Sequence, residues 1–158
     1  MNGPRSNRSP SPSLRHQRLA QRIFLALHSA IRDGSEAFIA PLDTVLSDDT
    51  ALQPDVIFVR RENAAILRDV IRGAPDLMIE VLSPSHAAFD RGPKLEAYAR
   101  PGVGECWLVD DEARTVELYR LEPGQGTYRR DEVLRPGAAV TTSLLPELSL
   151  ELSALFSD

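Results

Sequence analysis

The segment that most constrains the fold is residues 74–83, Ala-Pro-Asp-Leu-Met-Ile-Glu-Val-Leu-Ser. Apolar residues occupy both alternating sets of positions, which predicts a strand of about seven residues buried between two layers. Inside this strand lies one carboxylate, Glu80. An ionised carboxylate in a dry strand is costly unless it pairs with a cation or binds a metal. The first question that the sequence raises is therefore which partner Glu80 has.

Composition narrows the class of protein. The chain has 158 residues, of which 42% are hydrophobic and 26% charged, as expected for one globular domain with a real core. A net charge of −5 argues against coating nucleic acid by bulk electrostatics but leaves room for a local basic groove. The single cysteine, Cys106, fits a reducing compartment. No apolar run is long enough for a membrane span or a signal peptide, so we expect a cytoplasmic protein without a membrane segment.

Two regions are predicted. Residues 1–12 are rich in Ser, Pro, Asn and Arg and are expected to be a disordered leader, whereas residues 13–158 form a single domain. The domain begins with a helix from Ser13 to the Asp33–Gly34 stop, because apolar residues recur at four-residue steps: Leu19, Ile23, Leu27 and Ile31. Its arginine-rich first half either faces solvent or lies along a phosphate backbone.

The remaining elements are mostly strands. They are predicted at residues 37–47, 53–60, 74–83, 105–110, 115–121, 127–134 and 139–142, with a closing strand or helix at 144–156. Strict alternation in 115–121 indicates a half-exposed hairpin strand. A short helix starts near Pro93. This order predicts an α/β (α+β) fold, with a mixed central sheet flanked by helices.

Three carboxylates are candidates for a metal site. Asp55 and Asp76 each follow a proline at a strand entry, and with Glu80 they could hold one or two Mg²⁺ ions and activate a bound water. For either aspartate the alternative is a turn cap, because aspartate readily accepts from nearby backbone amides. For Glu80 the plainer alternative is a buried arginine partner that serves only stability.

Asp90 and Lys94 stand four residues apart around a helix start. They form either a surface ion pair, or a site in which Lys94 reaches over the carboxylates to orient water and stabilise developing charge. Lys94 is the only lysine of an arginine-rich chain, which indicates a chemical role for a compact ammonium. His16, near the start of the first helix, is a further candidate.

Several motifs together resemble the Uma-type restriction-endonuclease family of the PD-(D/E)XK nuclease superfamily. The resemblance covers about residues 11–156, and its most specific part is Glu80-Val-Leu-Ser-Pro-Ser followed by an aspartate and a lysine. The other motifs are Gln53-Pro-Asp55, Asp90-Arg-Gly-Pro-Lys94 with Tyr98, Gly102–Asp110 and Leu145-Pro-Glu-Leu. The resemblance implies a restriction-endonuclease-like fold.

For the site, the resemblance makes Asp55 and Glu80 the metal-binding carboxylates. The superfamily lysine usually stands two residues after the glutamate, where this chain has Leu82, and Lys94 is the substitute. Supporting roles around these three fall to Asp76, Asp90, His16 and Ser83.

The implied function is a Mg²⁺- or Mn²⁺-dependent endonuclease that hydrolyses phosphodiester bonds of DNA. Cutting both strands would require a two-fold homodimer. Family members usually begin with a hairpin that supplies a further carboxylate, whereas this chain has residues 1–12 there. A catalytically degenerate nuclease fold that serves as a binding or interaction module is therefore the alternative.

Overall fold

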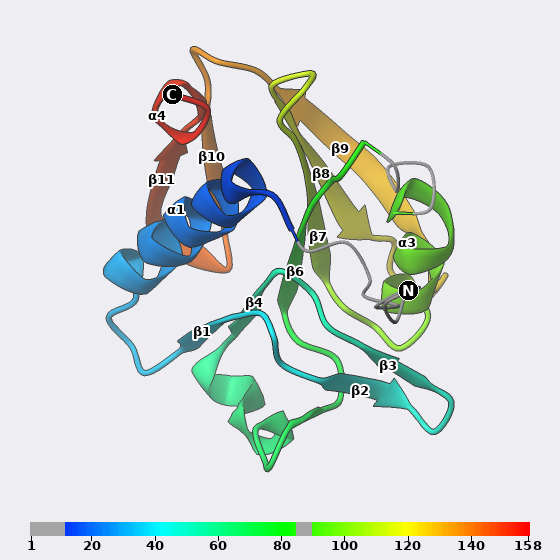
Figure 1. Ribbon diagram of the computed structural model, residues 1–158. Coiled ribbons are helices and arrows are strands. Elements are labelled where there is room, and N and C mark those ends of the chain that lie inside the picture. Colours follow the sequence, from blue (N-terminus) through cyan, green and yellow to red (C-terminus); the bar gives the residue numbers. More distant parts are fainter. Residues whose placement is uncertain (1–11, 85–89) are drawn as a thin grey trace, which may run out of the picture.

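The fold is built on a mixed six-stranded sheet (Figure 1). The computed structural model describes residues 12–84 and 90–158, so the predicted leader at 1–12 lies outside the described part except for its last residue. The sheet has the order β1-β4-β6-β7-β8-β9, in which β6 and β7 are parallel and all other neighbours antiparallel. Its strands are β1 (Glu36–Ile39), β4 (Val56–Val59), β6 (Leu77–Val81), β7 (Glu105–Asp110), β8 (Thr115–Leu121) and β9 (Tyr128–Leu134).

Two smaller sheets and several short helices complete the described residues. One small sheet pairs β10 (Ala139–Thr142) with β11 (Leu145–Glu151), and the other has the order β3-β2-β5, with β2 at Thr44–Ser47, β3 at Thr50–Leu52 and β5 at Ile71–Arg72. The helices are α1 (Leu14–Ala30), the 3₁₀-helix η1 (Arg61–Ile66), the π-turn η2 (Asp90–Lys94), α3 (Leu95–Ala99) and α4 (Leu152–Leu155). None of the helices in the described residues combines the length and the apolar character needed to cross a bilayer.

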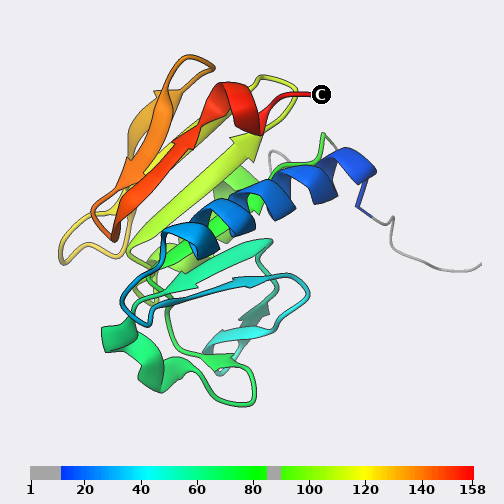
Figure 2. The same ribbon diagram turned by 90° about the vertical axis from the view of Figure 1, so that its left-hand side faces the viewer.

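The two faces of the main sheet are covered by different layers. Helix α1 lies on one side together with β10, β11 and α4, and η2 with α3 lies on the other (Figures 1 and 2). Since β6 and β7 are parallel, a crossover has to join them, and η2 and α3 lie in that connection. The predicted α/β sandwich is confirmed.

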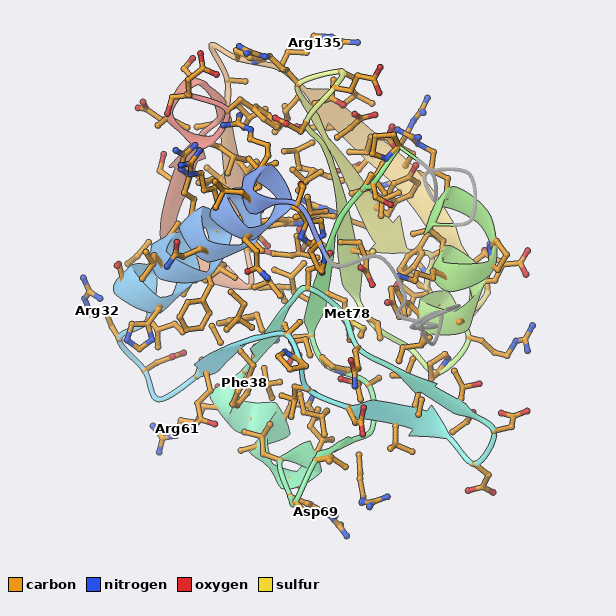
Figure 3. The ribbon with its side chains drawn as sticks, viewed as in Figure 1. Arg32, Phe38, Arg61, Asp69, Met78 and Arg135 are labelled. Atoms are coloured by element: carbon orange, nitrogen blue, oxygen red, sulfur yellow. The ribbon has the colours of Figure 1, made fainter. Side chains whose placement is uncertain are left out.

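Strand β6 distributes its side chains between two cores. Leu77, Ile79 and Val81 belong to the core beneath α1, whereas Met78, near the centre of Figure 3, belongs with Leu82 to the core beneath α3. Successive strand residues point to opposite faces, so Glu80 points to the α3 side. A strand buried on both faces was predicted, and all five residues of β6 are buried.

The first half of helix α1 is tied to the rest of the domain by polar contacts. Ser13 is the N-cap, and its hydroxyl accepts a hydrogen bond from the His16 backbone N–H at 3.0 Å. Arg15 contacts Asp111 at 3.0 Å and donates to the carbonyl oxygens of Phe156 and Ser157 at 2.7 Å. Arg22 donates to the carbonyl oxygens of Leu155 and Ser157 in the same C-terminal segment. Arg15 and Arg22 therefore make structural contacts within the domain.

Two predicted strands differ from the observed ones. The segment 37–47 is not one strand but two, because the chain turns at Pro41 and passes from β1 in the main sheet to β2 in a small sheet. The half-exposed strand predicted at 115–121 is buried over its first four residues, since both of its faces are covered there. In the tail, both predicted elements occur in sequence as β11 and α4.

Candidate metal and catalytic site

The pairing of β4 with β6 sets Asp55 opposite Glu80. Val56 lies opposite Ile79 in this antiparallel pair, and extending the register by one residue brings Asp55 to Glu80. Residues opposite each other on neighbouring strands have Cβ atoms about 5 Å apart and point to the same face. Asp55 and Glu80, two of the three carboxylates that the sequence indicates, are therefore neighbours at one end of the two strands.

Glu80 is almost fully buried, with 3% of its surface exposed. Its Oε1 accepts a hydrogen bond from the hydroxyl of Tyr98, and its Oε2 lies 3.5 Å from Nζ of Lys94. Burial, followed by the nearby Glu80 charge, raises the pKa of the Tyr98 phenol, so Tyr98 stays a neutral donor. Lys94 therefore supplies a cation beside Glu80, where the plainer alternative expected a buried arginine.

Asp55 links the start of β4 to the end of β6. Its Oδ2 accepts from the backbone N–H of Val81 at 2.8 Å and lies 3.4 Å from Nε2 of His16. The hydrogen bond to Asp55 raises the pKa of His16 above its ordinary value of 6.5, against the opposing effect of burial. The backbone of Val81 and the charge of Glu80 act in the same direction as Asp55. His16, on α1, thus joins the carboxylate pair from the opposite layer.

The donors at this site fit a hard divalent cation. Mg²⁺ is commonly held by one or two carboxylates and keeps several waters, and two adjacent carboxylates are what β4 and β6 present here. Among the side chains that the structure describes, no three of His, Cys, Asp or Glu converge as a closed metal cage would require. The site therefore offers two carboxylate donors, a set that fits a cation which keeps most of its water ligands.

The presence of Leu82 where the superfamily usually has its lysine has a structural reason. Leu82 is 7% exposed and packs in the core beneath α3 with Tyr98 and Leu95. A charged side chain there would lie under the helix, where burial without a partner is costly. Lys94 reaches Glu80 from above instead, at the junction of η2 and α3.

Asp76 lies at the opposite end of β6. Its Oδ2 accepts from the backbone N–H of Arg60 at 2.8 Å and from the Asn63 side chain at 3.2 Å. Four residues separate it from Glu80, about 13 Å along a strand. The turn-cap interpretation therefore describes its contacts, and the structure does not bring Asp76 to the carboxylate pair.

Two predicted site residues, Ser83 and Asp90, remain. Ser83 follows β6 at the Glu80 end of the strand and is partly buried. The backbone of Asp90 begins η2, and its side chain, with the predicted Asp90–Lys94 pair, lies outside the described part of the chain.

Tyr98 contacts Glu80, although the sequence motifs assign it no role in the site. The signal was available, since Tyr98 follows Lys94 by four residues and side chains at that spacing share one helix face. Another face of α3, with Leu95 and Ala99, lines a separate cavity of about 690 Å³ beside Tyr119 and Tyr128. Helix α3 thus separates that cavity from Glu80.

The α/β fold is similar to that of a solved structure. A crystal structure of "a putative nuclease belonging to DUF820" from Anabaena variabilis matches with a TM-score of 0.76 and 23% identity, over 93% of this chain and 83% of that one. A family model described as "Uma2: Putative restriction endonuclease" matches residues 7–153, and the chain belongs to this family. None of the curated proteins matches the chain. The resemblance drawn from the motifs is confirmed, and the family supports a nuclease.

Proposed function

We propose that the protein is a Mg²⁺- or Mn²⁺-dependent endonuclease that hydrolyses phosphodiester bonds of DNA. The observation that carries the proposal is the juxtaposition of Asp55 and Glu80 on neighbouring strands, with Lys94 beside Glu80. A buried glutamate beside a partly exposed aspartate, with one adjacent ammonium, resembles the arrangement that a divalent cation and a phosphoryl oxygen would need.

Each residue has a distinct task in this proposal. Asp55 and Glu80 would hold the metal, which when bound lowers the pKa of a water and offsets charge on the phosphate. Lys94 would orient the attacking water and stabilise the charge that develops on the phosphate oxygens. Tyr98, on α3, holds Glu80 in place through its hydroxyl. His16 orients Asp55 through its Nε2.

Calorimetry with Mg²⁺ or Mn²⁺ tests the metal site. We expect binding heat for the unaltered protein and none for Asp55→Asn or Glu80→Ala, while circular dichroism shows that both variants keep their fold. Asp76→Asn is the matched control, because this carboxylate also follows a Pro but lies at the other end of β6. Equal heats for all three variants would refute the carboxylate pair as the metal site.

Cleavage of plasmid DNA tests the activity. We expect metal-dependent nicking that Glu80→Ala abolishes and Lys94→Ala lowers by about 10² or more, the size of effect typical for a lost electrostatic or acid–base group. Metal binding without cleavage of DNA would favour the binding or interaction module. Cleavage that survives Glu80→Ala at normal metal concentration would remove the proposal.

Two finer proposals follow from the nuclease assignment. A cut of both strands would place two copies of the chain around a two-fold axis, and sedimentation in the presence of a DNA duplex would detect that dimer. The buried cysteine Cys106, the single cysteine of the sequence, favours a reducing compartment, for which we propose the cytoplasm.

A further inference from the structure

The segment that carries Lys94 is attached to the sheet at a second point. Arg91, three residues before Lys94, contacts Glu117 of β8 through Nη2 at 3.0 Å and Nε at 3.3 Å. The same guanidinium reaches Asp110 at the end of β7, at 3.2 Å. The hydroxyl of Tyr119 donates to the other oxygen of Glu117 at 2.7 Å. Glu117 is thus satisfied by two side chains although it is only 7% exposed.

The two attachment points lie in one row across the sheet. Leu108 of β7 pairs with Glu80 on one side and with Glu117 on the other. Directly paired residues point to the same face, so both glutamates point toward η2 and α3, with Cα atoms about 10 Å apart across two strand spacings. Arg91 contacts the outer glutamate and Lys94 the inner one.

This arrangement explains how Lys94 can be held beside Glu80 although it does not lie on strand β6. A lysine on a sheet strand is held in register by the backbone ladder, whereas Lys94 is on a short element joined to β6 by a connection. A flexible four-carbon side chain on such an element needs a fixed base if its ammonium is to stay over one carboxylate. The planar guanidinium of Arg91, bound through two nitrogens, supplies fixed geometry at the start of that element.

We propose that Arg91 and Glu117 form a positioning clamp that holds Lys94 over the Asp55–Glu80 pair. Arg91 acts through Lys94 and does not touch the reacting atoms. The kinetic part of this inference rests on the proposed nuclease function, but the placement of Lys94 can be measured without it.

The first experiment measures that placement directly. Lys94 is the only lysine of the chain, so an amine-reactive reagent labels one side chain, which mass spectrometry of its peptide follows separately from the N-terminus. Arg91→Gln combined with Glu117→Gln removes the ion pair without leaving a buried charge unpaired. We expect Lys94 in this double variant to react about threefold faster or more, as expected for a segment that opens more often.

Arg120→Ala is the matched control for labelling. It removes an arginine ion pair from the same strand, β8, where Arg120 lies 3.3 Å from Asp131. We expect the labelling rate of Lys94 to stay unchanged in this variant. Equal labelling rates in the unaltered protein and the Arg91→Gln/Glu117→Gln variant would overturn the clamp, whatever the protein does to DNA.

The second experiment separates positioning from general stability. In a cleavage assay we expect the double variant to lower kcat about tenfold with little change in KM, because a displaced catalytic group loses rate and not ground-state binding. In a Lys94→Ala background the same two substitutions should cause no further loss. A full additional loss in that background would overturn the inference, because Arg91 would then act independently of Lys94. If the protein cleaves no DNA, only the nuclease proposal is refuted. The labelling rates of Lys94 would still show whether Arg91 and Glu117 hold it in place.

Discussion

The hydroxyl of Tyr98 donates a hydrogen bond to Oε1 of Glu80, in a part of the core that α3 closes from above. Tyr98 is fully buried, so removing its hydroxyl leaves a carboxylate oxygen without that donor in a dry site. We therefore expect Tyr98→Phe to lower the free energy of unfolding by about 1–3 kcal/mol, the cost of an unsatisfied buried polar group. Urea denaturation would measure the change.

Tyr128→Phe is the control for this substitution. Its hydroxyl donates to the carbonyl oxygen of Val103 at 2.7 Å, which is a neutral acceptor. A neutral hydrogen bond contributes about 0.5–1.5 kcal/mol, so the loss should be smaller than for Tyr98→Phe. Equal or reversed losses would contradict a charged Glu80 beneath Tyr98.

Asp76→Ala should weaken the fold and leave the metal site intact. The substitution removes the acceptor for the backbone N–H of Arg60 and for the Asn63 side chain, and we expect a loss of about 1–2 kcal/mol. Thermal unfolding would show the loss, and calorimetry should return the metal affinity of the unaltered protein. A lower metal affinity at equal folding would place Asp76 in the site after all.

His16 should titrate above its ordinary value in metal-free protein. Its raised pKa means that the folded state favours the imidazolium, so the stability it contributes is fully present below 6.5 and is lost as pH rises through the higher folded value. Nuclear magnetic resonance would report the pKa, and Asp55→Asn should lower it because Asp55 is the main cause of the shift. A value at or below 6.5 with Asp55 present would contradict the contact.

Tyr119 offers a second titration, at alkaline pH. Burial and the hydrogen bond to Glu117 raise the pKa of Tyr119 to about 12, whereas the charge of Arg91 lowers it. The folded value exceeds the ordinary value of 10, so stability falls as pH rises from 10 through 12. Tyrosinate absorbance should show Glu117→Gln lowering the pKa and Arg91→Gln raising it, with Tyr119→Phe to assign the signal. Shifts of the same sign in both variants would be inconsistent with these contacts.

Local pattern was enough to predict α1, β6 and the sandwich around them. Four-residue periodicity marks Leu19, Ile23 and Leu27, which form the buried face of α1. A strand that is apolar on both faces has to lie between two layers, and β6 does. Glu80 could be recognised for the same reason, since it is the one charge in that strand.

The different fates of Asp55 and Asp76 could not be read from the sequence. Both follow a proline at the start of a strand, but β4 and β6 are antiparallel, so the two starts lie at opposite ends of the pair. Only Asp55 can then meet Glu80, which stands near the end of β6. Strand direction is a property of the assembled sheet, and no residue near either aspartate encodes it.

The burial of Glu117 and its ion pair with Arg91 could not be predicted from the sequence either. Alternation along 115–121 predicts two faces but does not say what covers each of them. Arg91, distant in sequence, covers the face with Glu117 and turns an apparently solvent-facing glutamate into a buried ion-pair partner.

The contacts of Arg15 tie two distant ends of the chain to one another. Arg15 directly precedes His16 and donates hydrogen bonds to the carbonyl oxygens of Phe156 and Ser157. Removal of residues 156–158 would take those acceptors away and let the first turn of α1 fray. Because that turn carries the imidazole beside Asp55, a change at residues 156–158 would reach the carboxylate pair without altering either of its residues.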